Sequence, residues 1–93
     1  MKAIWNGKII AESDETINIE NNHYFPPSAV NMKFLKKVET HTTCPWKGEA
    51  SYYDIVVDGE VNTDAAWYYA DPKPMAKGIK NYIAFWKAVK IIK

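Results

Sequence analysis

Turn-forming dipeptides set close together most constrain how this 93-residue chain can fold. Asn6-Gly7 lies between two apolar stretches, and Asp58-Gly59 follows residues 50–57, a stretch rich in aromatic and β-branched residues. Such dipeptides are the strongest short-range signals for tight β-hairpins, because both positions accept a positive φ. Residues 16–20 alternate apolar and polar side chains, as a half-buried strand does. The pattern predicts short antiparallel strands.

The rest of the chain adds more short elements of the same kind. Further strands are expected at residues 65–69, 83–86 and 89–92. A short helical turn, capped by Ser28, is expected through about residue 35, and a short helix over residues 75–82. Many short strands with one or two short helices are typical of a barrel or a bent sandwich. We therefore expect one mainly β domain over residues 1–93, α+β at most.

Composition argues against several other classes of protein. No apolar run approaches the roughly 20 residues that a membrane-spanning helix needs, and residues 1–7 lack the apolar core of a signal peptide. The single cysteine, Cys44, has no partner for an internal disulfide, which fits a reducing compartment. We expect a cytoplasmic domain that does not enter a membrane.

The charged residues bear on possible partners. All twelve basic residues are lysine, and the net charge is only +1. Arginine is the usual bidentate ligand of phosphate and guanine, so nucleic acid is not an expected partner. Residues 49–71 hold six acids and no base, whereas residues 72–93 hold six lysines and no acid. These segments form two solvated surfaces, or they pair with each other or with a second copy in a homodimer.

One stretch, residues 40–53, concentrates residue types that carry chemistry. Pro45 biases Cys44 toward extended backbone, and Gly48 can end a turn. The residues before Gly48 are therefore expected on a loop that leads into a strand, where binding residues tend to lie. The candidates on this loop are His41, Cys44, Trp46 and Lys47.

Aromatic residues give the second hint, because thirteen of the 93 residues are Phe, Trp or Tyr. Neighbouring side chains of a strand point to opposite faces, so Tyr52 and Tyr53 cannot both lie in the core. The same holds for residues 67–69. We expect Trp5, Phe85 and Trp86 in the core, and a pocket wall built from some of Trp46, Tyr52, Trp67 and Tyr69.

Three functions remain open at this point. The first is a binding domain for a small molecule or peptide, in which Lys47 supplies a positive contact and Tyr52 or Tyr69 a hydroxyl. The second is a thiol-dependent enzyme with Cys44 as nucleophile and His41 as base, although a free cysteine is usually an inert core residue. The third is a protein-interaction module that docks through exposed aromatic residues. A metal site of His23, His41 and Cys44 would lack a fourth ligand, and no cofactor is expected.

Several stretches together resemble a known family. They are residues 5–7, 22–26, 41–48, 50, 52–53, 57–59, 65–69, 72 and 85–86, and in them the chain resembles the bacterial "domain of unknown function 427" family. The resemblance implies a small mainly β fold similar to the β-tent of methionine sulfoxide reductase B and translationally controlled tumour protein. It implies no activity.

The family is sometimes labelled nucleotidyltransferase-like, and the residues of this chain do not support that label. Nucleotidyl transfer needs carboxylates spaced to hold a divalent metal and donors that cradle a triphosphate. The chain has no Asp-x-Asp pair and no glycine-rich loop. The paired Cys-x-x-Cys motifs that hold zinc in many relatives of this fold are also missing.

Overall fold

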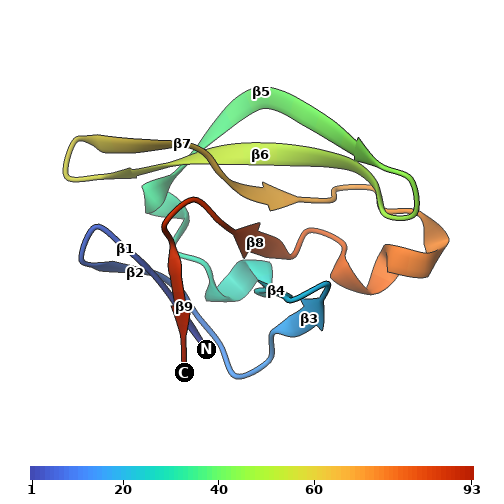
Figure 1. The fold of residues 1–93 in the computed structure, drawn as a ribbon, viewed down its shortest axis with the longest axis horizontal. Coiled ribbons are helices and arrows are strands. Elements are labelled where there is room, and N and C mark those ends of the chain that lie inside the picture. Colours follow the sequence, from blue (N-terminus) through green and yellow to red (C-terminus); the bar gives the residue numbers. More distant parts are fainter.

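The chain folds into nine short strands joined by tight turns and three single 3-10 helices (Figure 1). The computed structural model describes all residues from Met1 to Lys93. The strands are β1 (Lys2–Trp5), β2 (Lys8–Glu12), β3 (Ile17–Ile19), β4 (Asn22–Tyr24), β5 (Leu35–Cys44), β6 (Gly48–Val57), β7 (Glu60–Tyr68), β8 (Ile83–Phe85) and β9 (Lys90–Ile92). The 3-10 helices are η1 (Pro27–Ala29), η2 (Met32–Phe34) and η3 (Pro74–Ile79). The prediction of a mainly β domain is confirmed.

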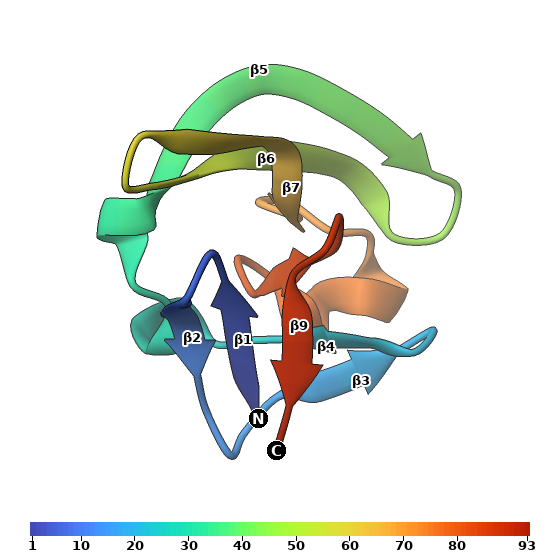
Figure 2. The ribbon, with the colours of Figure 1, turned by 60° about the vertical axis from the view of Figure 1, so that its left-hand side comes forward.

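Three antiparallel sheets make up the molecule. Their strand orders are β2-β1-β9, β3-β4 and β5-β6-β7-β8. Phe25 and Ile83 exchange backbone hydrogen bonds of 2.8 and 2.9 Å, so the β3-β4 hairpin continues onto β8. In Figure 2, β5, β6 and β7 arch above a lower layer that holds β1, β2 and β9, and the two chain termini lie side by side.

Both predicted hairpin turns are present. Asn6 and Gly7 have φ values of 50° and 75°, and Asp58 and Gly59 have values of 50° and 81°. A third turn of this kind joins β3 to β4, and there Glu20 occupies the first positive-φ position, at 55°. This conformation is uncommon for a residue with the shape of glutamate. The third turn therefore sets the backbone position from which the Glu20 side chain extends.

The four-stranded sheet is bent by irregular pairing. The register shifts between Lys37 and His41 on β5 and between Tyr53 and Ile55 on β6. At the bend, the Asp64 backbone N–H donates to Asp54 Oδ1 over 2.9 Å. Extra residues in one strand of a pair increase its local twist and bend it. The bend is visible as the arch of β5 in Figure 2.

Two sequence-based predictions about local structure are wrong. The short helical elements expected near residues 28–35 and 75–82 are present as 3-10 turns, but Ser28 does not cap the first one, which follows Pro26 and has no side-chain cap. Single turns of this kind are stabilised by tertiary packing rather than by helix propensity. The expected loop at 41–44 is the end of β5, because residues 41–44 pair with residues 48–51.

The apolar core divides into two clusters on opposite faces of the bent sheet. The larger cluster includes Phe25, Ile55 and Phe85, and Trp5 packs against its edge. The smaller one is built around Tyr24, Tyr69 and Ile79, with Tyr52 and Trp67 packed against it. The smaller cluster supports the candidate site.

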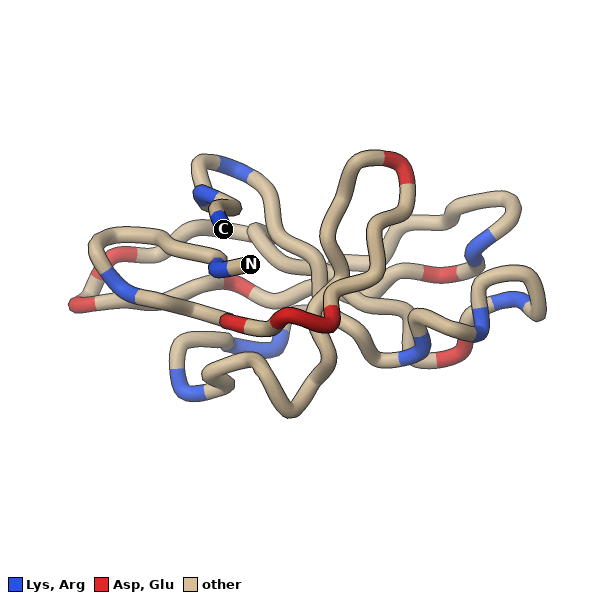
Figure 3. The backbone as a smooth tube through the Cα atoms, turned by 90° about the horizontal axis from the view of Figure 1, so that it is seen from below, with Lys and Arg blue, Asp and Glu red and all other residues tan.

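Charged residues of both signs are spread along the chain (Figure 3). Figure 3 shows lysines and acidic residues interspersed along the backbone, with both signs at each end of the long axis. No helix in the structure has the length and apolar character to cross a membrane.

Candidate functional site

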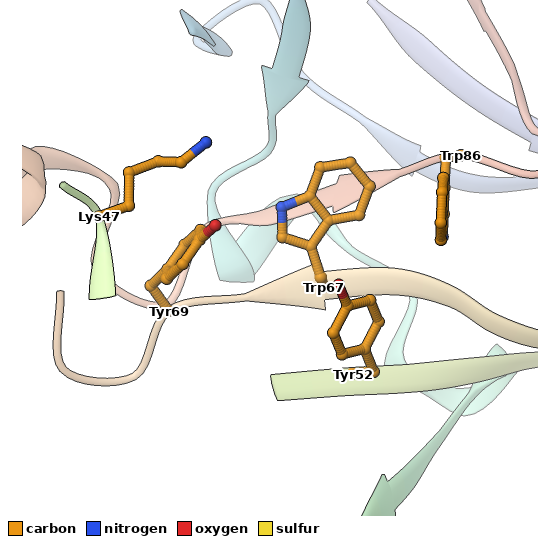
Figure 4. Close-up of a pocket in the computed structure, with 5 residues that line it drawn as sticks. All are labelled: Lys47, Tyr52, Trp67, Tyr69 and Trp86. Atoms are coloured by element: carbon orange, nitrogen blue, oxygen red, sulfur yellow. The ribbon is translucent and has the colours of Figure 1, made fainter. Parts of the chain in front are cut away.

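A cavity of about 190 Å³ opens on the face of the sheet above the smaller core cluster. Its walls are Lys47, Tyr52, Trp67, Tyr69 and Trp86 (Figure 4). Four of these five are residues that the sequence placed in a pocket wall or at its charged end. They come from the β5–β6 turn, from β6, from β7, and from the segments just after β7 and just after β8.

Strand pairing explains why the aromatic side chains meet. Tyr52 on β6 lies directly opposite Trp67 on β7, and Tyr69 follows two residues later on the same side. Tyr53 and Tyr68 point to the other face, where their rings stack with centroids 4.9 Å apart. The predicted division of the two aromatic runs between opposite faces is confirmed.

Trp67 is the fixed centre of the wall. Its indole N–H donates to Tyr24 Oη over 3.2 Å, and the two rings meet edge to face, with centroids 6.2 Å apart. On its other side lies Trp86, with centroids 6.0 Å apart and an interplanar angle of 84°. Rings held by both packing and a hydrogen bond have little freedom to turn. The two indoles therefore form a rigid right-angled corner.

The expectation that Trp86 belongs to the core is wrong. Trp86 is 47% exposed, whereas Phe85 beside it is 5% exposed and lies in the larger core cluster. The Trp86 indole N–H donates to the Asp64 carbonyl over 2.6 Å, which holds the ring over the cavity. The alternation of faces that separates Tyr52 from Tyr53 could have separated this pair as well. Phe85 and Trp86 are also neighbours at the end of a strand, so the same rule predicts that they point to opposite faces.

The β5–β6 turn delivers Lys47 to the other end of the cavity. Gly48 has φ = 110°, a conformation that favours glycine, and a Cβ there would lie 3.5 Å from Asp71 O and Lys73 N. The Lys73 backbone N–H donates to the Lys47 carbonyl over 2.9 Å, and Lys73 Nζ donates to the Pro45 carbonyl over 2.7 Å. The turn is thus held at both ends, and its lysine points inward (Figure 4).

Lys47 is a buried cation with one acidic partner. Its Nζ lies 2.5 Å from Glu20 Oε1, and it sits 5.3 and 5.6 Å from the ring centroids of Trp46 and Tyr69. Burial on its own lowers the pKa of Lys47, but the hydrogen bond to Glu20 and nearby groups outweigh burial and raise that pKa overall. The same hydrogen bond lowers the pKa of Glu20. The lysine remains charged at neutral pH.

Glu20 is a site residue that sequence reasoning missed. It precedes Asn21 in the β3–β4 turn and lies 27 positions before Lys47 in the chain. No local pattern marks this pairing, because it arises only when the β3–β4 hairpin packs beside the β5–β6 turn.

Tyr69 brings a free hydroxyl to the same end of the cavity. The residue as a whole is 4% exposed, and its hydroxyl makes no hydrogen bond within the protein. Because no buried polar side-chain atom lacks a partner, this hydroxyl itself keeps accessible surface. In Figure 4 it points toward the part of the cavity bordered by Lys47 and Trp67. Burial raises the pKa of Tyr69 to about 12 although the Lys47 charge opposes the shift, so the hydroxyl is protonated at neutral pH. The Tyr52 hydroxyl, in contrast, lies 2.9 Å from Thr42 Oγ1.

The remaining candidates lie outside the cavity. Trp46 is beside it, with its ring against the Lys47 ammonium. Cys44 is half-buried against the smaller core cluster. His41 is largely exposed, with its Nδ1 3.2 Å from Ser51 Oγ and 3.9 Å from Glu49 Oε1.

The structure does not bring the proposed base and nucleophile together. His41 and Cys44 are three residues apart on a regular part of β5, so their side chains point to opposite faces. His23, the third residue weighed as a metal ligand, lies on β4 with its Nδ1 3.0 Å from Thr16 Oγ1. No three His, Cys, Asp or Glu side chains are grouped as metal ligands.

Fold and site together define a small mainly β domain with an aromatic cavity that has one charged end. The family model described as "Domain of unknown function (DUF427)" matches residues 1–93, and the chain belongs to this family. A comparison with curated proteins found no match.

Proposed function

We propose that this chain is a binding domain whose ligand is a small molecule, or one side chain of a peptide, held against Trp67 and Trp86. The observation that carries the proposal is the right-angled indole corner. The two centroids are 6.0 Å apart, and the Trp86 ring is 47% exposed while a hydrogen bond to Asp64 keeps it in place. Rigid aromatic surface facing solvent gives contact area at little entropic cost when a ligand binds.

The size of the cavity limits the ligand. Pockets for drug-sized molecules measure roughly 300–1,000 Å³, and this cavity measures about 190 Å³. A ligand of one or two fused rings fits that space, and a larger one would extend into solvent past Trp86. The peptide form of the proposal therefore involves one inserted side chain.

A thermal-shift and tryptophan-fluorescence screen of the whole chain tests the proposal. The screen uses planar compounds of one or two rings, with acidic, neutral and basic substituents. A ligand at about 100 times its dissociation constant adds roughly 2.7 kcal/mol to the free energy of unfolding, which is easily seen for a domain of this size.

Two variants connect a hit to the site. Trp86→Ala should abolish the shift, whereas Val61→Ala, at an exposed position on β7 outside the cavity, should retain it. A hit that survives Trp86→Ala, or a screen in which no compound raises the melting temperature, would count against the proposal.

A further inference from the structure

Hydrogen-bond donors outnumber acceptors at the Lys47 end of the cavity. The lysine ammonium carries three N–H donors, and Glu20 accepts from one of them. The Tyr69 hydroxyl, on the same wall, has no partner within the protein and is open rather than buried, because no buried polar side-chain atom of the chain lacks a partner. Lys47 cannot turn away to reach solvent, because only 7% of its side-chain surface is exposed. This end of the cavity is therefore suited to an acceptor with negative charge.

Glu20 occupies only part of that position, and its side chain lies open to solvent. Its side chain is 55% exposed, so its carboxylate can rotate into water without losing hydration. It reaches Lys47 from a separate hairpin and does not line the cavity. An anion that enters the cavity can thus replace Glu20 at Lys47 and also reach Tyr69, which Glu20 does not contact.

We propose, as an extension of the function proposed above, that the ligand is a small aromatic acid. Its ring lies in the corner of Trp67 and Trp86, and its carboxylate or phosphate displaces Glu20 from Lys47 and accepts a hydrogen bond from Tyr69. Figure 4 shows Lys47 and Trp86 at opposite ends of the cavity, so one ligand spans both. Glu20 acts as an internal competitor that keeps the buried ammonium paired until the ligand arrives.

Matched probes test the charged end. Titration calorimetry on the whole chain compares naphthalene-2-carboxylate, the neutral naphthalene-2-carboxamide and 2-naphthyl phosphate. Hydrogen bonds to charged groups contribute about 1.5–3 kcal/mol, so the acid should bind at least about tenfold more tightly than the amide. The ratio of the two acids distinguishes a carboxylate ligand from a phosphate ligand. Equal binding of acid and amide, or binding of neither, overturns the inference.

Three variants test the competition. Glu20→Gln should tighten binding of the acid and leave the amide unchanged, because it removes only the competing charge. Lys47→Met should abolish the preference for the acid. Tyr69→Phe, which removes a hydroxyl without a partner in the protein, should weaken the acid more than the amide. Weaker binding of the acid to a folded Glu20→Gln variant would overturn the role of Glu20.

The two proposals fail in different ways. If neutral planar compounds bind and are lost in Trp86→Ala, the binding function stands and the acidic ligand is wrong. If inorganic phosphate alone binds as tightly as 2-naphthyl phosphate, the aromatic walls contribute nothing and both proposals are wrong. If no compound in the screen binds, the binding function itself is wrong.

Discussion

The Lys47 ammonium and the Glu20 carboxylate lie 2.5 Å apart, yet 7% of the lysine side chain and 55% of the glutamate side chain are exposed. Removing one partner of this ion pair therefore has a different consequence from removing the other. Without Lys47, Glu20 stays in water. Without Glu20, a buried ammonium loses its only acidic partner.

This asymmetry predicts unequal effects on stability. Glu20→Gln should lower the free energy of unfolding more than Lys47→Met, because an unpaired buried charge is costly and an exposed one is not. Methionine approximates the shape of the lysine stem, so the cost of Lys47→Met should stay below about 1.5 kcal/mol. Urea unfolding at pH 7 measures both variants. The opposite order would show that Lys47 is not confined as the structure indicates.

Stability at high pH should depend on Tyr69. Burial raises its pKa from 10.0 to about 12, so between these values the folded chain retains a proton that the unfolded chain has lost. The contribution of Tyr69 to the free energy of unfolding is fully present below pH 10 and is lost as the pH rises toward 12. The free energy of unfolding should therefore fall less between pH 10 and 11 in Tyr69→Phe than in the original chain. Urea unfolding at pH 7, 10 and 11 tests this, with pH 7 as the control. The same pH dependence of the unfolding free energy in both chains would contradict the prediction.

The two indoles should separate binding from stability. Trp86 is 47% exposed, so Trp86→Ala should cost about 1 kcal/mol or less for the apolar area that it buries. Trp67 contacts Tyr24, Trp86 and the smaller core cluster, so Trp67→Ala should cost about 3 kcal/mol. Both variants should lose ligand binding. Chemical unfolding together with the ligand titration would reveal the difference, and equal stability costs would argue against the fixed corner.

Glycine is required at position 48 and not at position 78. Gly48→Ala places a side chain at φ = 110°, 3.5 Å from two backbone atoms, and should cost about 1–3 kcal/mol while displacing Lys47. At Gly78, in η3, a Cβ would meet nothing within 4 Å, so Gly78→Ala is the matched control and should be close to neutral. If Gly48→Ala left the stability unchanged, the β5–β6 turn would be able to adopt another backbone conformation, contrary to the structure.

Cys44 should not take part in binding. It does not line the cavity, and His41 lies on the opposite face of β5. Cys44→Ser should therefore bind the ligand within about twofold of the original chain, a difference under about 0.5 kcal/mol. Loss of binding in a folded Cys44→Ser variant would contradict this prediction and support the thiol-dependent enzyme.

Features that depend on neighbouring residues were predictable from the sequence. Asn6-Gly7 and Asp58-Gly59 specify their turns because positive φ is a local property. The division of Tyr52 from Tyr53 follows from the two-residue period of a strand. Together these rules predicted a mainly β fold and the separation of neighbouring aromatic side chains between two faces.

Features that depend on distant pairing were decided by the tertiary structure. His41 is in a strand rather than a loop because residues 48–51 pair with residues 41–44. Trp86 follows the end of β8 and is exposed, although Phe85 beside it is buried. Glu20 meets Lys47 across 27 residues of chain. Local rules state which side chains share a face, but the packing of separate hairpins decides what each face meets.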